Sequence, residues 1–499
     1  MRLRGFAGAI ALLATALSPA SAEASPLFEL AGGVTGTSGF NARVTGAGAP
    51  STYFNPALLT RAPRVFEVGV LVLSEQISLT LDGRTGGDVP LVVGDRRIVD
   101  GTGAPIDNAT VPTDWLEHGC APTQCGEPRF APRPRQAAGS SGETRAYQIL
   151  GLVVPLIDER LALGFHALIP LGKFTTARSF YNDEREQFFT NSLHPELYSD
   201  RLTATSLAFG AGVGILENLS AGLSFTLNLT NTADSRTYVR DPIDYDKLLA
   251  DTNVDVRASL SPHFGLAWRP IERLGLAATA HSEQKLEIET AFSAALPAGQ
   301  ESDTTLAAVH GFLPWTFALG GEFEVLHVQE HSVAVATTLK YARWSDYVDR
   351  HAQSPSRDGA YFAWQDTISP SIGGRYAHGP LKTYLDFAYE PSPVPLQIGR
   401  SNYVDNDRAS LSLGGSHDFE LFDLDFRVSA QLQGHRLIER HQTKRDDLLI
   451  DELPDDAVNA VDGTPVAGAA GLQTNNAGWP GFASDGYIYG GSVALALLY

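Results

Sequence analysis

Alternating apolar and polar residues recur along this chain. Between residues 219 and 230, apolar side chains occupy every odd position from Leu219 to Leu229, and small polar residues or glycine occupy the even positions. This two-residue period is that of a β-strand with one apolar and one polar face. The same pattern returns at 254–268, 274–280 and 424–432. The repetition predicts a protein built mainly from amphipathic strands.

The predicted strands are long, and their connections are unequal. Strands of soluble proteins usually contain about 5–6 residues, whereas a tilted strand that crosses a membrane needs about 9–11. Tight turns are expected near 217–218, 272–273 and 420–422. Long polar connections are expected at 82–143, 176–201, 235–253, 291–312, 347–366, 391–406 and 439–485. Short periplasmic turns and long external loops are typical of outer-membrane barrels.

The pattern predicts fourteen strands, at 64–81, 144–156, 159–175, 202–216, 219–234, 254–270, 273–290, 313–326, 330–346, 367–378, 380–390, 407–418, 423–438 and 486–499. An even number allows a closed antiparallel barrel, which leaves no unpaired strand edge in lipid. The fold class is therefore predicted as all-β, a 14-stranded antiparallel transmembrane β-barrel over 63–499. The last strand ends on Tyr499, which resembles the terminal aromatic by which the barrel assembly machinery recognises its clients.

Composition narrows the possible partners. The 499 residues include 37 Lys and Arg against 57 Asp and Glu, which gives a formal net charge of −20. That balance argues against nucleic acid as a partner, because phosphate is neutralised by basic patches. With 43% apolar residues and a mean hydropathy of −0.08, the chain fits neither a helical membrane protein nor a disordered one.

The first 22 residues have the features of a signal peptide. Arg2 and Arg4 precede an apolar run at 6–17, and Ala20-Ser21-Ala22 offers small residues for cleavage. The alternative, an N-terminal membrane anchor, is disfavoured because a spanning helix needs about 20 apolar residues. We expect export, with a mature chain that begins near Glu23.

A segment of about 40 residues, rich in glycine, alanine and serine, separates the signal peptide from the first strand. A segment that neither crosses the membrane nor extends away from the barrel would fit in the lumen. We therefore expect residues 23–62 to form a plug.

Three motifs point to a family. The plug segment contains Asn55-Pro56-Ala57. Residues 341–345 read Tyr-Ala-Arg-Trp-Ser, and residues 389–395 contain Ser-Pro-Val-Pro and are followed by Asp-Asn-Asp-Arg at 405–408. In this order the motifs resemble those of the FadL-type outer-membrane transporters of fatty acids and hydrocarbons, in which Asn-Pro-Ala lies in an N-terminal hatch. The resemblance covers nearly the whole mature chain, but the first external loop is unusually long and the hatch upstream of Asn55 matches poorly.

The resemblance implies a function, which is passive transport of hydrophobic compounds. Burial in an apolar site is worth about 0.8 kcal/mol per CH₂, so a ligand with a long chain needs a conformational change for its release. The family's route is capture among the external loops, transfer to a pocket in the barrel, movement of the hatch and exit through the wall. We expect long-chain fatty acids as ligands, with aromatic hydrocarbons as the alternative. We expect no cofactor.

Pro170 and Gly172 are candidates for the strand kink that opens the wall sideways in this family. Proline removes a donor from the strand ladder and glycine permits a bend. The alternative is a strand that simply ends there.

Inward-facing cations are candidates for binding a carboxylate head group. Arg257, Lys285 and Arg427 fall on the polar face of their predicted strands, and Arg236 lies where the fifth strand enters its loop. The alternative is pairing with neighbouring acids, namely Asp255, Glu283, Glu287 and Asp425.

Three other features have a less specific meaning. Cys120 and Cys125 predict a small disulfide loop in an exported protein, because two thiolates alone make an incomplete zinc site. The acidic cluster at 446–456 indicates a solvated surface, with cation bridging to lipopolysaccharide as the alternative. His327 and His331 match H-x-x-E-H, but a metal site of that kind needs a helix and this motif lies at a predicted turn.

Two other classes of function compete with a transporter, namely a porin or structural barrel and an enzyme. A diffusion porin or structural barrel would have an open lumen, and a G-x-S-x-G elbow typical of one hydrolase class does not occur in the sequence. We therefore expect a monomeric, non-enzymatic protein of the Gram-negative outer membrane, in contact with its lipid and lipopolysaccharide.

Overall fold

The structure, a computed structural model, describes residues 26–81, 92–93, 96–97, 143–157, 160–172, 194–195, 197–198, 202, 205–239, 248–295, 301–348, 363–398, 403–443 and 481–499. The predicted signal peptide, the Cys120–Cys125 pair and the acidic cluster lie outside these residues. Within the described ranges, no helix is long and apolar enough to cross a membrane.

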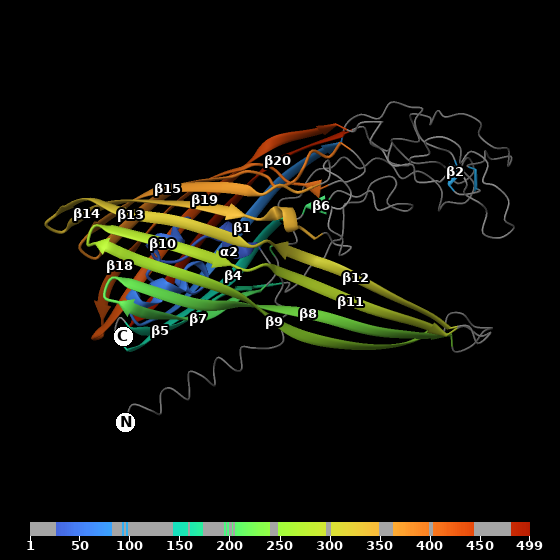
Figure 1. Cartoon of the computed structure of the whole chain (residues 1–499), viewed down its shortest axis with the longest axis horizontal. Helices are drawn as coiled ribbons and strands as arrows, with labels where there is room; N and C mark the ends of the chain where they lie inside the picture. The colour runs from blue at the N-terminus through green and yellow to red at the C-terminus, as the bar shows by residue number, and fades with distance from the viewer. Residues whose placement is uncertain are drawn as a thin grey trace, which may run out of the picture.

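Fourteen antiparallel strands close into a barrel (Figure 1), which confirms the predicted fold class. Each strand pairs with its neighbour in chain order, and β1 pairs with β20 along its whole length to close the ring. The strands are β1 (Val65–Leu81), β4 (Glu143–Ile157), β5 (Leu161–Pro170), β7 (Ser206–Leu216), β8 (Leu219–Val239), β9 (Leu248–Ile271), β10 (Leu274–His281), β13 (Thr316–Val328), β14 (His331–Ala342), β15 (Thr367–His378), β16 (Leu381–Glu390), β18 (Arg408–Leu421), β19 (Leu424–Thr443) and β20 (Gly481–Leu498).

The apolar face of the strands points outward and the polar face points into the lumen. On β8, Leu223 is 41% exposed, whereas its polar neighbours Ser224 and Thr226 are buried. Val493 and Leu495 on β20 are exposed in the same way. This arrangement is the inverse of a soluble sandwich and is the one expected for a barrel whose outer surface contacts lipid. We call the end with tight turns periplasmic and the opposite end external.

One predicted strand and two predicted loops were wrong. The strand expected at 273–290 is broken at Ser282 and Glu283, so that β10 is followed by a separate strand, β11 (Gln284–Ala295). The loop expected at 291–312 contains the end of β11 and most of β12 (Glu301–Leu313), and the loop expected at 235–253 carries extensions of β8 and β9. β11 pairs in parallel with the far part of β8, outside the ring of fourteen. Because these extensions lie beyond the ring, they lack the lipid-facing alternation that identified the other strands.

The N-terminal residues 26–62, which we call the luminal segment, lie inside the barrel (Figure 1). They form α2 (Leu27–Ala31), α3 (Ala42–Thr45), α4 (Ser51–Phe54) and the 3-10 helix η1 (Pro56–Arg61). Their hydrogen bonds reach inward-facing side chains around the ring, including Glu67 on β1, Asp386 on β16 and Ser492 on β20. Only a segment within the lumen can contact strands on several sides of a closed ring.

Short elements complete the external end. β17 (Tyr403–Val404) pairs in parallel with β6 (His194–Pro195), and the 3-10 helix η4 (Trp344–Asp346) follows β14. A separate pair, β2 (Val92–Val93) with β3 (Arg96–Arg97), lies in the first external connection.

Candidate functional site

The Asn55-Pro56-Ala57 motif fixes the luminal segment to the wall. The Asn55 side chain is fully buried, accepts a hydrogen bond from the Ala57 N–H at 3.2 Å and so caps η1. Its Nδ2 donates to the carbonyl of Arg43 at 2.9 Å and to that of Leu266, on β9, at 3.3 Å. A single amide therefore connects two turns of the luminal segment and one strand.

Glycines in the wall make room for this motif. Gly212, Gly222 and Gly265 lie side by side on β7, β8 and β9. A Cβ atom at Gly222 would clash with the backbone of Pro56, and one at Gly265 would clash with the Asn55 side chain. The backbone of the motif thus packs directly on bare strand backbone.

A buried ion pair on the opposite wall holds a second part of the luminal segment. Asp386 is fully buried and pairs with Arg375 on the neighbouring strand. Its Oδ2 also accepts hydrogen bonds from the N–H groups of Phe40 at 2.8 Å and Asn41 at 3.2 Å, while Arg375 donates to the carbonyl of Ser38 at 3.2 Å. The pair therefore binds the turn before α3 through backbone groups.

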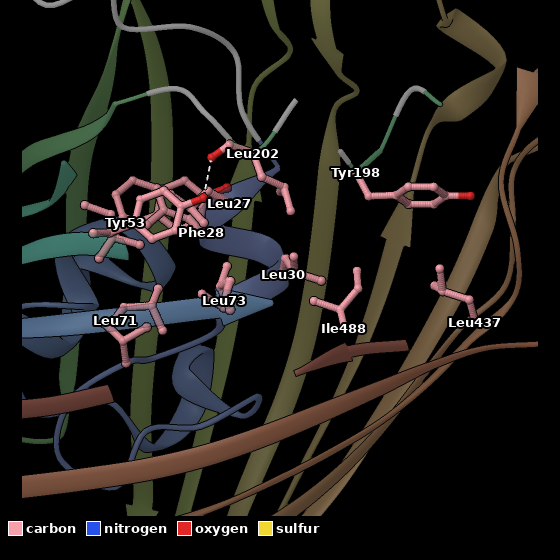
Figure 2. Packing of buried hydrophobic residues seen from close by; sticks show 14 of the residues in the cluster. Leu27, Phe28, Leu30, Tyr53, Leu71, Leu73, Tyr198, Leu202, Leu437 and Ile488 are labelled. Carbon is pink, nitrogen blue, oxygen red and sulfur yellow. Dashed lines mark hydrogen bonds between the residues drawn. The ribbon is translucent and has the colours of Figure 1, made fainter. Parts of the chain in front are cut away.

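Apolar packing surrounds α2. Figure 2 shows Leu27, Phe28 and Leu30 near Leu71 and Leu73 of β1, and the dashed line marks the hydrogen bond at Leu202. That bond is donated by the Tyr147 hydroxyl to the Leu202 carbonyl at 2.7 Å. Nearby, the Tyr198 hydroxyl donates to Asn406 at 3.1 Å, so Tyr198 and Leu202 cover part of the external face of the lumen.

A cavity of about 90 Å³, which we call the mouth cavity, lies on the external side of α2. Its wall is formed by the external ends of β10, β13, β14, β15, β16 and β18. Polar lining groups come from the luminal segment and the wall, and include Glu29, Tyr53, His281, Lys340, Glu390 and Arg408. Leu30, Leu197, Leu313, Ala342 and Trp344 contribute apolar surface to the same cavity.

Five alternating charges, which we call the charge chain, pass through this region. Arg43 pairs with Glu29 at 2.5 Å, and Glu29 pairs with Lys340 at 3.2 Å. Lys340 pairs in turn with Glu390 at 2.5 Å, and Glu390 pairs with Arg408. Two of its cations, Lys340 and Arg408, line the mouth cavity together with Glu29, Glu390 and Asp405, whereas Arg43 does not line it. A ligand carboxylate is a group that these two cations could bind in place of one of the acids.

The luminal partners of the chain have altered pKa values. Burial alone would raise the pKa of Glu29, but Arg43, Lys340 and His281 hold it well below 4.5. Burial and the Glu29 charge raise the pKa of Tyr53 well above 10, and the Tyr53 hydroxyl donates to Glu29 at 2.9 Å. Glu29 is therefore an anion and Tyr53 a neutral donor at neutral pH.

Two histidines pack together at the mouth cavity, and one of them, His281, lines it. The rings of His263 and His281 lie 4.3 Å apart, and both lie within 5.1 Å of the Tyr53 ring. His263 shares a hydrogen bond with the Thr226 hydroxyl at 2.6 Å, and His281 contacts the Phe54 carbonyl at 3.3 Å. Among the described residues, no group of three or more His, Cys, Asp or Glu side chains has the arrangement of a metal site.

An aromatic cluster forms the external rim. Tyr347 and Trp364 stack at 3.6 Å between ring centroids, with Trp344 5.5 Å and Tyr403 5.4 Å from Trp364. Phe312 joins the cluster from β12, 5.6 Å from Tyr347. Because Trp344 also lines the mouth cavity, the aromatic cluster and the charge chain form one continuous region.

The structure separates the residues predicted for the head group. Arg427 forms a bidentate ion pair with Asp418, with N···O distances of 2.5 and 2.8 Å. This pair lies near the periplasmic turn, at the opposite end of the barrel from the mouth cavity. Lys285 is half-buried on β11 but does not line the cavity. For Arg236, on β8, and Arg257, on β9, only the backbone is described.

Pro170 and Gly172 lie at the end of a strand rather than within one. The expected strand at 159–175 stops at Pro170, and Leu171 and Gly172 form a bend. In the part of the chain that the structure describes, the last β5–β7 pair involves Leu168, whereas pairing with β4 continues to Pro170, which has no N–H to donate. The structure thus agrees with the alternative stated above, in which the strand ends at this motif.

Lys340 and Arg408 were missed as candidates although the sequence contained a signal for them. Lys340 directly precedes the Tyr-Ala-Arg-Trp-Ser motif, and Arg408 ends the Asp-Asn-Asp-Arg motif. Both residues lie at external strand ends, and the described side chains of both are mostly buried. A search for inward-facing cations next to those motifs would have found them.

The H-x-x-E-H motif lies at the periplasmic turn between β13 and β14, as predicted. His327 pairs with Glu324 at 2.8 Å, and His331 bonds to the Tyr376 hydroxyl at 2.9 Å. The two histidines thus have different partners.

Comparisons with known proteins agree with this architecture. Residues 13–462 match the family model described as outer membrane protein transport protein (OMPP1/FadL/TodX). A FadL homologue from Pseudomonas aeruginosa has the same fold, with a TM-score of 0.54 and 15% identity over 96% of this chain and 98% of that one. The toluene transporter TodX from P. putida gives a TM-score of 0.45 and 13% identity, covering 96% and 99% of the two chains.

The comparison with curated protein sequences gives no match. Members of the matched family are transport channels of the Gram-negative outer membrane, and family and fold together indicate transport of hydrophobic compounds. A closed barrel, a filled lumen and a family match over most of the sequence lead to one assignment. This chain belongs to the OMPP1/FadL/TodX family of outer-membrane transport proteins.

Proposed function

We propose that this protein takes up long-chain fatty acids by passive transport. The observation that carries the proposal is that two cations of the charge chain, Lys340 and Arg408, line the mouth cavity beside its apolar residues. A carboxylate would bind near Lys340 and Arg408, and the hydrocarbon chain would contact Leu313, Ala342 and Trp344. An ion pair of this kind is strengthened where water is excluded.

Entry of the whole ligand requires movement of the luminal segment. The mouth cavity, at about 90 Å³, has room for a head group and not for a long acyl chain. Lys340 binds Glu29 of α2 and Glu390 of the wall at the same time. A ligand carboxylate would compete with Glu29 for Lys340, so binding would weaken the attachment of α2 and favour an open hatch.

Sideways release would occur where β5 loses its neighbour. Among the described residues, Leu168 and Ser206 are the last pair between β5 and β7, and Pro170 has no N–H donor. This position lies at the external end of the strands, so the route would carry ligand from the lumen toward lipid. The Cys120–Cys125 disulfide and residues 1–22 as a signal peptide remain predictions.

Aromatic hydrocarbons are the second candidate ligands. The Trp344, Tyr347 and Trp364 cluster at the rim favours them, because flat aromatic side chains stack well on flat apolar ligands. A neutral hydrocarbon, however, gains nothing from Lys340 or Arg408. The two ligand classes therefore differ in their dependence on these cations.

Uptake assays distinguish the two. Radiolabelled oleate and toluene are supplied to a transporter-deficient strain that expresses the wild-type barrel, Lys340→Gln or Lys382→Gln. Lys382 is a matched control because it is a half-buried lysine near the periplasmic end. We expect Lys340→Gln to lower oleate uptake at least tenfold, with toluene uptake unchanged and Lys382→Gln near wild type.

Two results would contradict the proposal. Equal oleate uptake by Lys340→Gln and wild type would show that Lys340 does not bind the ligand carboxylate. Uptake of toluene without oleate would show that the ligands are aromatic hydrocarbons. Single-channel conductance provides a separate test, since a large open-pore current in the wild-type barrel would indicate a diffusion porin.

A further inference from the structure

Four buried histidines of the barrel wall face the luminal segment. They are His166 on β5, His263 on β9, His281 on β10 and His435 on β19, and none is more than 3% exposed. The other histidines whose exposure the structure describes lie near strand ends and are exposed, namely His327, His331, His378, His417 and His441. Within the described part of the chain, histidine is therefore buried only where the luminal segment covers the wall.

Each buried ring contacts an aromatic ring of the luminal segment. The distances between ring centroids are 5.3 Å for His166 and Phe28, 5.1 Å for His263 and Tyr53, 4.9 Å for His281 and Tyr53, and 5.7 Å for His435 and Phe40. Phe28 lies in α2, Phe40 lies before α3 and Tyr53 lies in α4. The histidines therefore hold three separate turns of the segment.

His263 and His435 have hydrogen bonds that suit the neutral ring. His263 bonds through Nε2 to the Thr226 hydroxyl at 2.6 Å, and His435 bonds through Nδ1 to the Ser410 hydroxyl at 2.8 Å. Among the described residues, the other nitrogen of each ring is buried and has no hydrogen-bond partner. A charged imidazole has two N–H donors, so a second proton would leave one donor and one charge buried without a partner, which is unfavourable.

Cations outnumber anions around His435. This ring lines a cavity of about 40 Å³, which Phe40 also lines. The charged groups in the lining of that cavity are Arg43, Lys340, Arg408, Glu29 and Glu390. A proton on His435 would add a fourth positive charge against two negative ones.

One acid faces His263 and His281, and its nearer oxygen is already occupied. Oε1 of Glu29 lies 3.9 Å from Nδ1 of His281, but it accepts hydrogen bonds from Arg43 at 2.5 Å and from Tyr53 at 2.9 Å. Across the mouth cavity, His281 also faces Lys340, Arg408, Glu390 and Asp405. Because the two histidine rings lie 4.3 Å apart, a proton on one would oppose a proton on the other.

His166 has a different environment. It pairs with Gly151 on β4 and with Ala208 on β7, and Glu67 on β1 occupies the space over Gly151. Glu67 accepts a hydrogen bond from Thr35 at 3.0 Å. Since His166 and His281 each lie near an acid, His263 and His435 are the rings that a second proton would disturb most.

We propose that the luminal segment is an acid-sensitive plug, which neutral His263 and His435 hold in place and which is released when these rings take up a proton. Water reaches both nitrogens of each ring only when the segment moves away, so proton binding favours the displaced state. An imidazole in water takes up its second proton at about pH 6.5. The contribution of these rings to the packed state is therefore complete above that pH and is lost as the pH falls. This response needs no ligand and is separate from the proposed transport of fatty acids.

Hydrogen exchange of the full-length barrel in lipid nanodiscs measures release of the segment. Protection factors, which correct for the effect of pH on the intrinsic exchange rate, are compared at pH 8 and pH 5. The informative amides are 44–46 and 53–55, whose N–H groups donate to carbonyls within the luminal segment. Residues 367–378, in β15, provide an internal reference.

The test variant combines His263→Gln with His435→Asn. A glutamine amide reaches the place of Nε2 and an asparagine amide reaches that of Nδ1, so the bonds to Thr226 and Ser410 are kept while neither residue can titrate. His331→Asn is the matched control, because His331 also bonds through Nδ1 to a hydroxyl but is exposed at the periplasmic turn.

We expect protection at 44–46 and 53–55 in wild type to fall at least fivefold from pH 8 to pH 5, with β15 unchanged. His331→Asn should follow wild type, and the double variant should change less than twofold. Glu29 does not account for such a fall, since its pKa lies well below 4.5. Asp405 does not account for it either, because its raised pKa makes its contribution grow as the pH falls.

Equal protection of wild type at the two pH values would overturn the proposal, as would an equal fall in wild type and the double variant. If the double variant lacks protection even at pH 8, ¹³C NMR of the ring Cε1 atoms follows His263 and His435 directly in the wild-type barrel. Titration of both rings together with the loss of protection would support the proposal. Release of the segment while both rings stay neutral would contradict it.

Discussion

The Nζ atom of Lys340 in the barrel wall lies 3.2 Å from Oε2 of Glu29 in the first helix of the luminal segment. These residues are 311 positions apart in the sequence. Their contact joins the part of the protein proposed to move to the part that stays fixed. It also places the ligand's proposed competitor, the Glu29 carboxylate, directly at the mouth cavity.

Glu29→Gln should loosen α2. The change removes the anion shared by Arg43 and Lys340, and loss of one partner of a buried ion pair costs about 3–5 kcal/mol. We expect amide hydrogen exchange across 27–31 to accelerate at least tenfold. Glu143→Gln is the control, because that carboxylate pairs with Arg145 but is 52% exposed. Unchanged exchange in Glu29→Gln would show that apolar packing alone holds the helix.

Gly222→Ala should displace the Asn55-Pro56-Ala57 turn. The new methyl group would overlap the backbone of Pro56, and overpacking of this kind costs about 1–3 kcal/mol. Thermal unfolding of the purified barrel should show a lower Tm than wild type. The control is Gly374→Ala on β15, where a Cβ atom meets nothing within 4 Å. A similar Tm for both variants would contradict close packing at Gly222.

Asp386→Asn should free the turn before α3. The substitution removes the ion pair with Arg375 and weakens the acceptor for the Phe40 and Asn41 amides. Faster exchange of those two amides, with little change at 55–57, is the expected result. Asp485→Asn is a suitable comparison, since its pair with Arg436 is longer, at 3.8 Å, and partly exposed. Loss of protection throughout 26–62 would instead mean that the luminal segment is released as one unit.

Asp405, in the connection between β17 and β18, should make stability depend on pH. Burial raises its pKa from 3.8 to about 7, against the opposing effect of hydrogen bonds from Ser392 and the Asn406 backbone. Because the folded-state pKa is the higher one, the stabilising contribution is complete below about pH 3.8 and is lost as pH rises toward 7. The full change corresponds to about 4 kcal/mol.

Asp405→Asn, which stays neutral, should remove this part of the pH dependence. Its free energy of unfolding relative to wild type should therefore be higher at pH 8 than at pH 5. Denaturant titrations at several pH values provide the measurement. A constant difference between the two proteins across this range would show that Asp405 does not titrate with a raised pKa.

Local pattern was sufficient for much of the barrel. The strand expected at 367–378 is β15 (Thr367–His378), and the alternation at 219–230 correctly separates the lipid-facing Leu223 from the luminal Ser224. A strand that contacts lipid on one side must repeat every two residues, so each strand carries its own signature. The Asn55-Pro56-Ala57 motif predicted a hatch by resemblance, and in the structure its residues lie in the luminal segment.

Only the tertiary structure determines which residues far apart in the sequence contact one another. Alternation places Arg427 and Lys340 on the same inward face, yet one pairs with Asp418 near the periplasmic turn and the other with Glu29 at the mouth. The outer surface over β10 depends in the same way on Ala280 lying opposite Phe264 and Phe317. A two-residue period indicates which side of the sheet a residue faces. The position of a residue along the barrel axis and the side chains that it contacts depend on strand register and ring closure, which involve residues far apart in the chain.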